Sequence, residues 1–406
     1  MHFTSQDLVV NHRSNLDANN GATVELFVRW FKPDLPPGRP HQPVLMVHGR
    51  SSPGLVSFDL RYDAGEGRYS WARELAEDGF DVFVMDLQGM GRSTRPVQMN
   101  DPCNINPLQQ HILLPREPCA ARYPKQLTNS ASDWAELGTV VNWILGQPGM
   151  PAKIDLIGYS AGAYAVGPYA MTVDPAKVAS LLLLAPIFAV EGPSTPPTPL
   201  PVSTPCSVYG FPMHILHRAG FKKSWDSEVN AEPCYPGQRD DAHDIVDVVW
   251  EAFLDNDQLG RTWGPGVSRF RNGYWWGWNR ERVTADRTNL GEEVPVLIVY
   301  GEKDMTANYT PLNFSVPELY RSIQGRRKLM YRVNGAGHLV VWERQRRWLH
   351  TLSRKWLRSA RHPNRPYNVD GNTTGTFVVP WEGDPVEMDY TSGRTEQPVA
   401  VPVEPM

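Results

Sequence analysis

Short apolar segments alternate with helical segments along most of the chain, and this alternation constrains the fold more than any other feature. The strand candidates are residues 23–31, 43–47, 81–87, 153–157, 180–186, 295–300 and 328–333. The helix candidates are residues 71–79, 161–171, the segment with Trp134, Leu137 and Val141, and the segment with Leu349, Leu352 and Trp356. Such alternation favours a mostly parallel sheet with helices on both faces. The sequence therefore predicts an α/β fold with ligand sites at the carboxyl ends of its strands.

Two long excursions interrupt this pattern. The first covers residues 88–130, and the second covers residues 189–293 and begins with six prolines between Pro193 and Pro205. We expect residues 1–188 and 294–360 to form the core, with 88–130 as an insertion, and residues 189–293 to form a cap or lid. Residues 361–406 are polar and carry seven prolines. This last segment is predicted to be a tail that packs on the surface.

A serine lies where a predicted strand turns into a predicted helix. The sequence there is Gly158-Tyr159-Ser160-Ala161-Gly162, and small residues continue into the helix. A G-x-S-x-G turn between strand and helix raises the serine oxygen above the sheet, and its glycines permit the sharp turn and close packing. The alternative, a chance Gly-Ser turn, leaves the strand and helix context unexplained. We therefore expect Ser160 to be a nucleophile.

Candidates for the base and the orienting acid follow two later strands. A serine hydroxyl is a weak nucleophile near neutral pH and needs a base, which a third group holds in place. The strand 295–300 leads to Glu302 and Asp304, and the strand 328–333 leads to His338. Asp304 is preferred to Glu302 because it lies farther beyond the strand end. The predicted catalytic residues are therefore Ser160, Asp304 and His338.

The segment His48-Gly49-Arg50 follows the early strand 43–47 and can supply donors for a developing oxyanion. The backbone N–H groups of Arg50 and Ala161 are the predicted donors. Two roles compete for the side chain of Arg50: it either binds a substrate carboxylate or is a solvated surface group.

Together these motifs resemble the α/β-hydrolase superfamily from roughly Thr23 to Ser359. The order of Ser160, Asp304 and His338 is that of the superfamily, and His48-Gly49 and the segment 86–93 (DLQGMGRS) are similar to two of its usual segments. Within it, the chain looks like bacterial lidded serine hydrolases. The resemblance implies an α/β-hydrolase fold whose cap roofs the active site. We then expect Tyr159 and the cap residues Trp275, Trp276 and Trp278 to line an apolar or aromatic pocket, or the tryptophans to form cap core instead.

The four cysteines all follow prolines in loop-like sequence. Pairing Cys103 with Cys119 and Cys206 with Cys234 would close each excursion locally, and we expect these two disulfides rather than four free thiols. Disulfides persist in oxidising compartments, so we expect a secreted or periplasmic protein. The first residues show no export signal, and a cytoplasmic location is the alternative.

Charge and composition exclude several classes of partner. Lys and Arg number 40 against 44 Asp and Glu, a net charge of −4, which supplies no broad positive field for nucleic acid. The longest apolar run has about ten residues where a membrane span needs about 20. The segment Gly89-Met90-Gly91 lacks the third glycine of a dinucleotide fingerprint, and the cysteines lack close metal-ligand spacing. We expect neither a cofactor nor a metal.

The sequence as a whole predicts a serine hydrolase that cleaves carboxylic esters of an apolar or aromatic small molecule through an acyl-enzyme. Amide, lactone, thioester and carbon–carbon bond hydrolysis use the same residues and are alternatives. From another class, the alternative is a ligand-binding protein that has kept the fold without catalysis.

Overall fold

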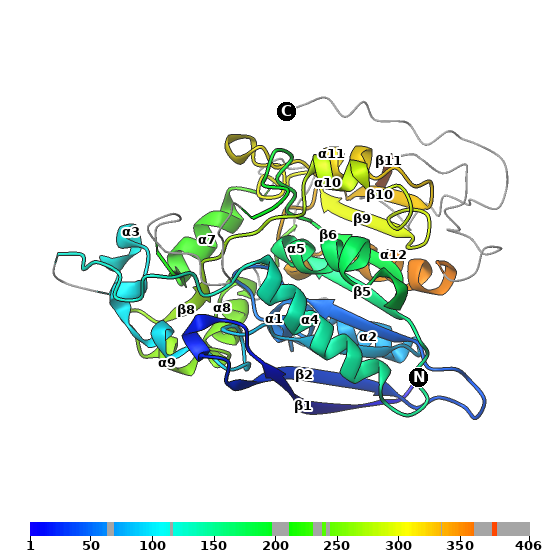
Figure 1. Ribbon diagram of the computed structural model, residues 1–406, viewed down its shortest axis with the longest axis horizontal. Helices are drawn as coiled ribbons and strands as arrows, with labels where there is room; N and C mark the ends of the chain where they lie inside the picture. Colours follow the sequence, from blue (N-terminus) through cyan, green and yellow to red (C-terminus); the bar gives the residue numbers. More distant parts are fainter. Residues whose placement is uncertain are drawn as a thin grey trace.

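The computed structural model of the chain describes residues 1–62, 69–113, 117–196, 211–229, 238–240, 244–333, 335–360 and 376–379. Among these residues, a large sheet has the strand order β1-β2-β4-β3-β5-β6-β9-β10-β11, and a small sheet pairs β7 with β8 (Figure 1). The strands are β1 (Phe3–Arg13), β2 (Thr23–Pro33), β3 (Pro43–Val47), β4 (Asp81–Met85), β5 (Ile154–Tyr159), β6 (Val178–Leu184), β7 (Met213–His217), β8 (Val267–Arg271), β9 (Val296–Gly301), β10 (Lys328–Val333) and β11 (Thr376–Val379).

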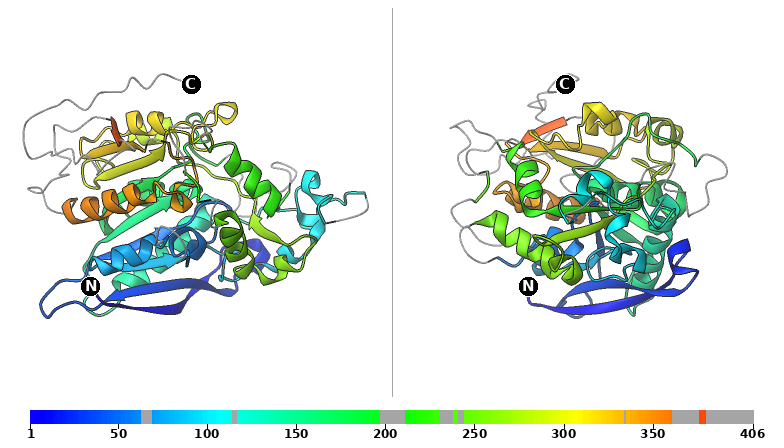
Figure 2. Two further views of the ribbon diagram at one scale, coloured as in Figure 1. Left: turned by 180° about the vertical axis from the view of Figure 1, so that it is seen from behind. Right: turned by 90° about the vertical axis from the view of Figure 1, so that its left-hand side faces the viewer.

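The large sheet is mostly parallel, which confirms the predicted fold class. Strand β2 runs antiparallel to its neighbours β1 and β4, whereas the other neighbouring strands run parallel. Figure 2 shows β1 and β2 (dark blue) at one edge of the sheet and β9 and β10 (yellow) towards the other. Strand β1 was not predicted from the sequence, because most of its residues are exposed at the sheet edge, where no apolar pattern is needed.

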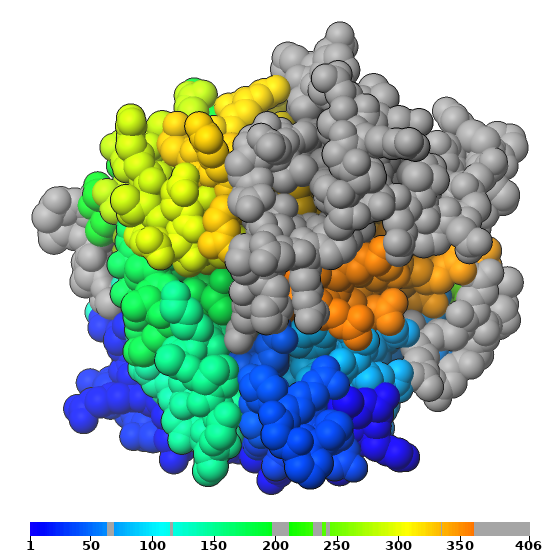
Figure 3. Space-filling model, turned by 90° about the vertical axis from the view of Figure 1, so that its right-hand side faces the viewer, coloured from blue at the N-terminus to red at the C-terminus, as the bar shows by residue number. Residues whose placement is uncertain are grey.

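The helices connect the strands and cover both faces of the large sheet. They are α1 (Gly54–Phe58), α2 (Trp71–Glu77), α3 (Pro107–Gln110), α4 (Ser130–Leu145), α5 (Ala163–Pro168), α7 (Arg218–Asp226), α8 (Ile245–Asp255), α9 (Gln258–Arg261), α10 (Arg280–Ala285), α11 (Val316–Ser322) and α12 (Arg346–Ser359). Figure 1 shows α4 and α5 in front of the sheet with α2 and α12 behind it. Figure 3 shows α12 (orange) beside the light blue segment that contains α2.

Successive side chains of the central strands point to opposite faces and form two separate cores. In β3, Met46 packs in the core beneath α2 and α12, and the next residue, Val47, packs in the core beneath α4 and α5. All five residues of β3 and all five of β4 are buried. Because both faces are covered, these strands are continuously apolar, and this is why the sequence pattern located them.

Helix α5 is shorter than the predicted helix over residues 161–171. A 3-10 turn, Ser160–Gly162, precedes it, and a π-helical turn, Tyr169–Val173, follows it. Pro168 has no backbone N–H to donate to the preceding turn, so regular α-helical bonding is interrupted there.

The two excursions pack against each other on one side of the molecule. Figure 1 shows α3 of the first excursion near α7, α8, α9 and β8 of the second. Ile105 forms a β-bridge with Met213, and the side chain of Gln109 hydrogen-bonds both the N–H and the C=O of Ile215. Their shared apolar cluster is Met99, Ile105, Leu127, Met213, Ile215 and Val267.

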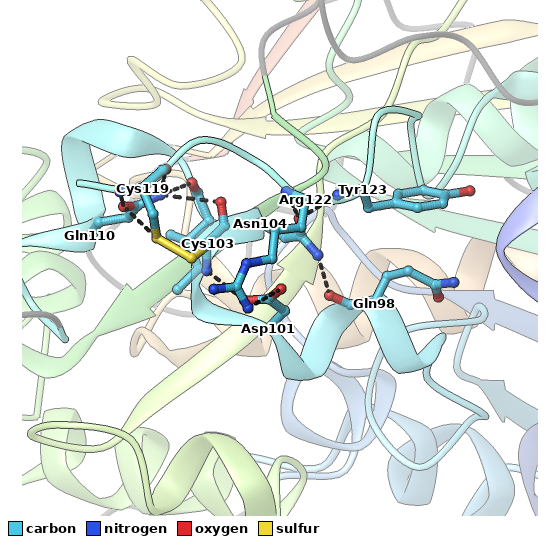
Figure 4. The surroundings of a disulfide bond; sticks show 9 residues. Gln98, Asp101, Cys103, Asn104, Gln110, Cys119, Arg122 and Tyr123 are labelled. Carbon is cyan, nitrogen blue, oxygen red and sulfur yellow. Dashed lines mark hydrogen bonds and ion pairs between the residues drawn. A yellow bond between two sulfur atoms is a disulfide. The ribbon is translucent and has the colours of Figure 1, made fainter.

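A disulfide joins Cys103 to Cys119 within the first excursion (Figure 4). The side chain of Gln110 lies beside it, donating to the carbonyl oxygens of both cysteines and accepting from the N–H of Cys119. The other predicted pair, Cys206 with Cys234, lies outside the described residues, as does the predicted tail apart from β11. No helix in the described part of the chain is long and apolar enough to cross a membrane.

Candidate active site

Ser160 occupies a strained turn between β5 and α5. Its φ angle is +54°, a backbone conformation that residues other than glycine rarely adopt and that costs on the order of 1–3 kcal/mol. The turn is also crowded, since a Cβ atom on Gly162 would lie 2.6 Å from the carbonyl oxygen of Val47 and 2.7 Å from that of His48. Glycine at position 162 therefore allows the end of β3 to lie directly against the turn that carries Ser160.

The structure brings together Ser160, His338 and Asp304 from the carboxyl ends of three parallel strands, β5, β10 and β9. His338 Nε2 lies 2.9 Å from Ser160 Oγ, and His338 Nδ1 lies 3.0 and 3.1 Å from the two carboxylate oxygens of Asp304. Asp304 Oδ1 also accepts a hydrogen bond from the N–H of Ala307 at 2.7 Å. The competing acid Glu302 accepts instead from the N–H of Gly335 at 2.9 Å.

The imidazole of His338 is almost completely enclosed. Burial opposes its protonation, but the nearby carboxylates of Asp304, Glu228 and Glu343 outweigh burial, so the pKa of His338 is raised. The ring of Tyr159 stacks on the imidazole at 5.6 Å between centroids, and its hydroxyl donates to the carbonyl oxygen of His338 at 3.0 Å. Tyr159 thus fixes the ring and its backbone together.

Two buried carboxylates that the sequence analysis did not single out hold the loop that carries His338. Glu228 Oε2 accepts from the N–H of His338 at 2.6 Å, and Glu228 Oε1 accepts from the N–H of Met305 at 3.2 Å and from Thr306 Oγ1 at 3.0 Å. Glu343 Oε2 accepts from the N–H of Gly337 at 2.9 Å. Burial raises the pKa of Glu228, and it raises that of Glu343 to about 7. Neither residue belongs to a recognisable motif, so their sequence context carried no signal.

The loop after β3 approaches the serine closely. A Cβ atom on Gly49 would lie 3.0 Å from Ser160 Cβ. His48 holds this loop, because its Nε2 accepts from the N–H of Leu87 at 3.0 Å and its Nδ1–H therefore donates to the carbonyl oxygen of Gly49 at 2.6 Å. Burial lowers the pKa of His48, which keeps this neutral form.

Two backbone N–H groups near Ser160 suit an anion. Within the described residues, the N–H of Arg50 has no hydrogen-bond acceptor. The N–H of Ala161 belongs to the first turn of the helical segment after Ser160, where backbone donors lack acceptors within the helix. The structure thus places both predicted donors beside the serine.

A pocket of about 340 Å³ opens in front of the serine. Ser160, His338, Tyr159 and Arg50 lie in its wall, and most of the remaining wall is apolar. The larger apolar wall residues are Tyr164, Ile187, Leu216, Phe221, Phe253, Phe270, Trp275, Leu312, Phe314, Leu339 and Trp342. The site can therefore hold an apolar or aromatic group beside a hydroxyl and an imidazole.

The three predicted pocket tryptophans occupy different environments. Trp275 lines the pocket, stacks on Tyr164 at 5.6 Å and donates to Asp133 Oδ2 at 3.0 Å. Trp278 is 1% exposed and packs in the core beneath α4 and α5. Trp276 packs edge-on against Trp134 at 5.8 Å and is absent from the described pocket wall. The segment follows no regular period, so the sequence could not separate these roles.

Comparison with known proteins gives a family and several structural likenesses. The alpha/beta hydrolase family model matches residues 44–351. A thermophilic esterase from Thermogutta terrifontis is 17% identical, and the comparison covers 87% of this chain and 99% of that chain with a TM-score of 0.47. An esterase from Rhodococcus sp. is 13% identical, covering 89% and 100%, with a TM-score of 0.46. A laboratory-evolved variant of potato epoxide hydrolase is 14% identical, covering 87% and 99%, with a TM-score of 0.47. No curated protein matches the chain.

Proposed function

Since this chain belongs to the alpha/beta hydrolase family, we propose that it is a serine hydrolase that cleaves carboxylic esters through an acyl-enzyme. The observation that carries the proposal is the continuous contact from Ser160 Oγ through the imidazole of His338 to the carboxylate of Asp304. A nucleophile, a base within hydrogen-bond reach and a group that orients the base are the parts that acyl transfer requires.

In the first half of the reaction, Ser160 Oγ attacks the ester carbonyl carbon while His338 Nε2 takes the hydroxyl proton. The imidazolium formed lies against Asp304, which stabilises its charge and holds Nδ1–H in place. The backbone N–H groups of Arg50 and Ala161 donate to the oxyanion of the tetrahedral intermediate. When the intermediate collapses, His338 returns the proton to the leaving alkoxide, and an alcohol departs.

In the second half, water replaces the alcohol. His338 takes a proton from water as the water oxygen attacks the acyl carbon of the Ser160 ester. Collapse of the second intermediate breaks the bond to Ser160 Oγ, which takes the proton back from His338. The products are one carboxylic acid and one alcohol, and the enzyme is unchanged.

The substrate is expected to be a small molecule with an apolar or aromatic part. The aromatic wall of the pocket supports this, and Tyr159 and Trp275 are the sequence-predicted residues that we propose for substrate contact. We propose residues 189–293 as a cap on the core formed by residues 1–188 and 294–360, because Phe221, Phe253, Phe270 and Trp275 from this segment stand in the pocket wall. The disulfide Cys103–Cys119 supports an oxidising compartment as the place of function.

Two measurements test the proposed function. A fluorophosphonate probe should label Ser160 in the wild-type protein and leave the Ser160→Ala variant unlabelled. A series of p-nitrophenyl esters of rising chain length, run beside matched amides and lactones, should show ester cleavage with the highest kcat/KM. An unlabelled wild-type protein would favour a ligand-binding role, and faster amide or lactone cleavage would change the bond type but keep the same catalytic residues.

A further inference from the structure

Arg50 places a cation in the same pocket as the nucleophile. Its side chain is exposed, and it lines the pocket with Ser160 and His338. Arg50 Nη2 donates to Asn272 Oδ1 at 2.9 Å, and the guanidinium lies 5.6 Å from the ring centroid of Phe270 and 5.8 Å from that of Trp275. A neutral amide and two rings therefore hold the cation in a defined position within the wall.

The amide that holds Arg50 is itself oriented by the backbone. Asn272 Nδ2 donates to the carbonyl oxygen of Phe211 at 2.8 Å, which turns Oδ1 towards the guanidinium. Asn272 thus adds a hydrogen bond to Arg50 without adding a negative charge. The contact positions the cation and leaves its charge uncompensated.

No carboxylate pairs with Arg50 in the described part of the chain. The neighbouring arginine, Arg271, does have acidic partners, with Asp133 at 3.2 Å and Glu136 at 3.4 Å. The acid in the described pocket wall, Glu228, accepts hydrogen bonds from His338, Met305 and Thr306. Apart from His338, Arg50 is the one basic side chain among the described residues of the pocket wall.

The surroundings of Arg50 make the binding of an anion more favourable. The protein around the pocket withdraws part of its hydration, and this desolvation lowers the pKa of Arg50 to about 10, so the group is still a cation at neutral pH. Burial, followed by the charge of Arg50, lowers the pKa of nearby His214 to about 3. His214 is therefore neutral and adds no second positive charge. A guanidinium has five N–H donors in a planar fork, and among the described residues Asn272 takes one of them.

We propose that Arg50 binds a carboxylate of the substrate, so that the preferred esters carry a single negative charge together with an apolar or aromatic part. This inference rests on the proposed ester hydrolysis and names the substrate class of that site. A carboxylate matches the planar fork of a guanidinium and can accept two parallel hydrogen bonds. A single cation balances a monoanion, whereas a phosphate dianion would leave one charge unpaired in an apolar pocket.

The position of Arg50 also limits where the carboxylate lies. The backbone N–H of Arg50 is proposed to bind the oxyanion, and its guanidinium lies in the same pocket wall as Ser160. The distance between the bound carboxylate and the reacting carbonyl is therefore limited by the length of the Arg50 side chain. Phe270 and Trp275 flank the guanidinium and would contact the part of the substrate that links its two polar groups.

The test compares esters that differ only in charge. For the acyl side, the pair is the p-nitrophenyl monoester of adipic acid and the p-nitrophenyl ester of adipic acid monoamide. For the alcohol side, the pair is 4-acetoxybenzoate and 4-acetoxybenzamide. In at least one pair, the wild-type kcat/KM for the carboxylate should exceed that for the amide by roughly 10- to 100-fold, the range of a charge-assisted hydrogen bond.

Variants of Arg50 then test whether this residue causes the preference for the carboxylate substrate. In Arg50→Gln the carboxylate-to-amide ratio should fall to about one, and in Arg50→Lys it should fall in part, because an ammonium keeps the charge but loses the planar fork. Any loss of oxyanion binding affects both esters equally and therefore cancels in the ratio. Arg287→Gln is the matched control, since Arg287 is exposed in the turn between α10 and β9 and its loss should leave the ratio at the wild-type value.

A binding experiment separates this inference from the proposed reaction. Calorimetry on Ser160→Ala should give at least tenfold tighter binding of 3-phenylpropionate than of 3-phenylpropionamide. If the wild-type protein hydrolyses no ester but this difference is found, the proposed ester hydrolysis is wrong and the carboxylate site stands. A wild-type ratio near one, a ratio that survives in Arg50→Gln, or equal binding of the two ligands would overturn the inference about Arg50.

Discussion

At the scale of single residues, His338 depends on four residues from three separate segments of the chain. Ser160 and Asp304 contact its two ring nitrogens, Tyr159 stacks on the ring, and Glu228 holds its backbone N–H. A base in catalysis works best when its pKa lies near the operating pH. The three carboxylates around His338 raise its pKa against the effect of burial, and they can therefore set the pH range in which the imidazole is neutral.

Removing members of the proposed triad should have effects that do not multiply. Ser160→Ala and His338→Ala should each lower kcat for a p-nitrophenyl ester by several orders of magnitude, and the double variant should be hardly worse because the two groups act as one unit. Asp304→Asn should also be severe, since the imidazole loses the acceptor that orients it. Glu302→Gln is the control and should be far milder, as Glu302 accepts from the N–H of Gly335 and pairs with Lys303 rather than with His338. Effects that multiply, or a more damaging Glu302→Gln, would contradict the assignment.

The pH dependence should reveal the role of Glu228. His338 must be neutral to act as a base, so kcat/KM should fall as the pH drops through its raised pKa, with a midpoint above 6.5. The carboxylate of Glu228 contributes to that raised pKa. Glu228→Gln should therefore move the acidic midpoint to lower pH, while the amide oxygen can still accept from the N–H of His338.

Glu302→Gln serves as the control for the pH profile. It removes a nearby carboxylate that is not among the groups that raise the pKa of His338. Its acidic midpoint should stay at the wild-type value. If Glu228→Gln lowers kcat without moving the midpoint, Glu228 has only a structural role in the loop.

At the scale of elements, the proposed active site is a consequence of parallel strands. The carboxyl ends of parallel strands lie at one edge, so β3, β5, β9 and β10 bring the loop with Gly49 and Arg50, Ser160, Asp304 and His338 to the same place. The second excursion contributes further residues to the wall of the same pocket. Phe270 lies on β8, Phe221 on α7 and Phe253 on α8, and all three reach the pocket wall. The core thus supplies the proposed reacting groups, and the excursion supplies much of the apolar wall.

The tryptophans of the segment after β8 should respond differently to truncation. Trp275→Ala removes a ring from the pocket wall, and losing a few tens of Å² of apolar contact at about 25 cal/mol per Å² costs roughly 1 kcal/mol of binding. The ratio of kcat/KM for aromatic or long esters to that for acetyl esters should fall about five- to tenfold. Acetyl esters alone should be little affected.

Trp278→Ala is the matched control for Trp275→Ala. Trp278 is enclosed in the core, and emptying such a site typically costs about 3–5 kcal/mol of unfolding free energy. Its truncation should lower the melting temperature and leave the long-to-short ester ratio unchanged. The assignment fails if Trp275→Ala lowers the melting temperature as much as Trp278→Ala and also leaves that ratio unchanged.

At the scale of the whole molecule, the two excursions form one structural unit beside the sheet. Arg269 in β8 donates to the carboxylate of Asp257 and to the carbonyl oxygen of Met99, which joins the second excursion to the first. The bridge Ile105–Met213 and the cluster around it add apolar contact. The disulfide Cys103–Cys119 closes the outer part of the first excursion. The first excursion therefore contacts β7 and β8 of the second excursion, and Phe270 of β8 lies in the pocket wall.

Removing this disulfide should destabilise the protein. Cys103→Ser with Cys119→Ser opens a loop of 16 residues, and a loop of about that length contributes roughly 3 kcal/mol in the chain-entropy account. Urea unfolding should show a loss of that order. Wild-type protein treated with a reductant should approach the stability of the variant, and an unchanged unfolding free energy in both would contradict a stabilising role.

Local patterns in the sequence determined the core strands, the turn at Ser160 and the order of the three proposed catalytic residues. They did so because a buried parallel strand must be apolar along its length, and because the positive-φ turn at Ser160, between a strand and a helix, has the short motif G-x-S-x-G. These requirements act within a few residues of each other. They are therefore visible without knowledge of the rest of the fold.

Only the tertiary structure decided which distant groups meet. Glu228 and Glu343 support the loop of His338, Trp278 belongs to the core while Trp275 faces the pocket, and the guanidinium of Arg50 bonds the neutral amide of Asn272. Each of these outcomes depends on contacts between segments that are far apart in the chain. A side chain's hydration, charge and packing are set by such neighbours, and no local pattern specifies them.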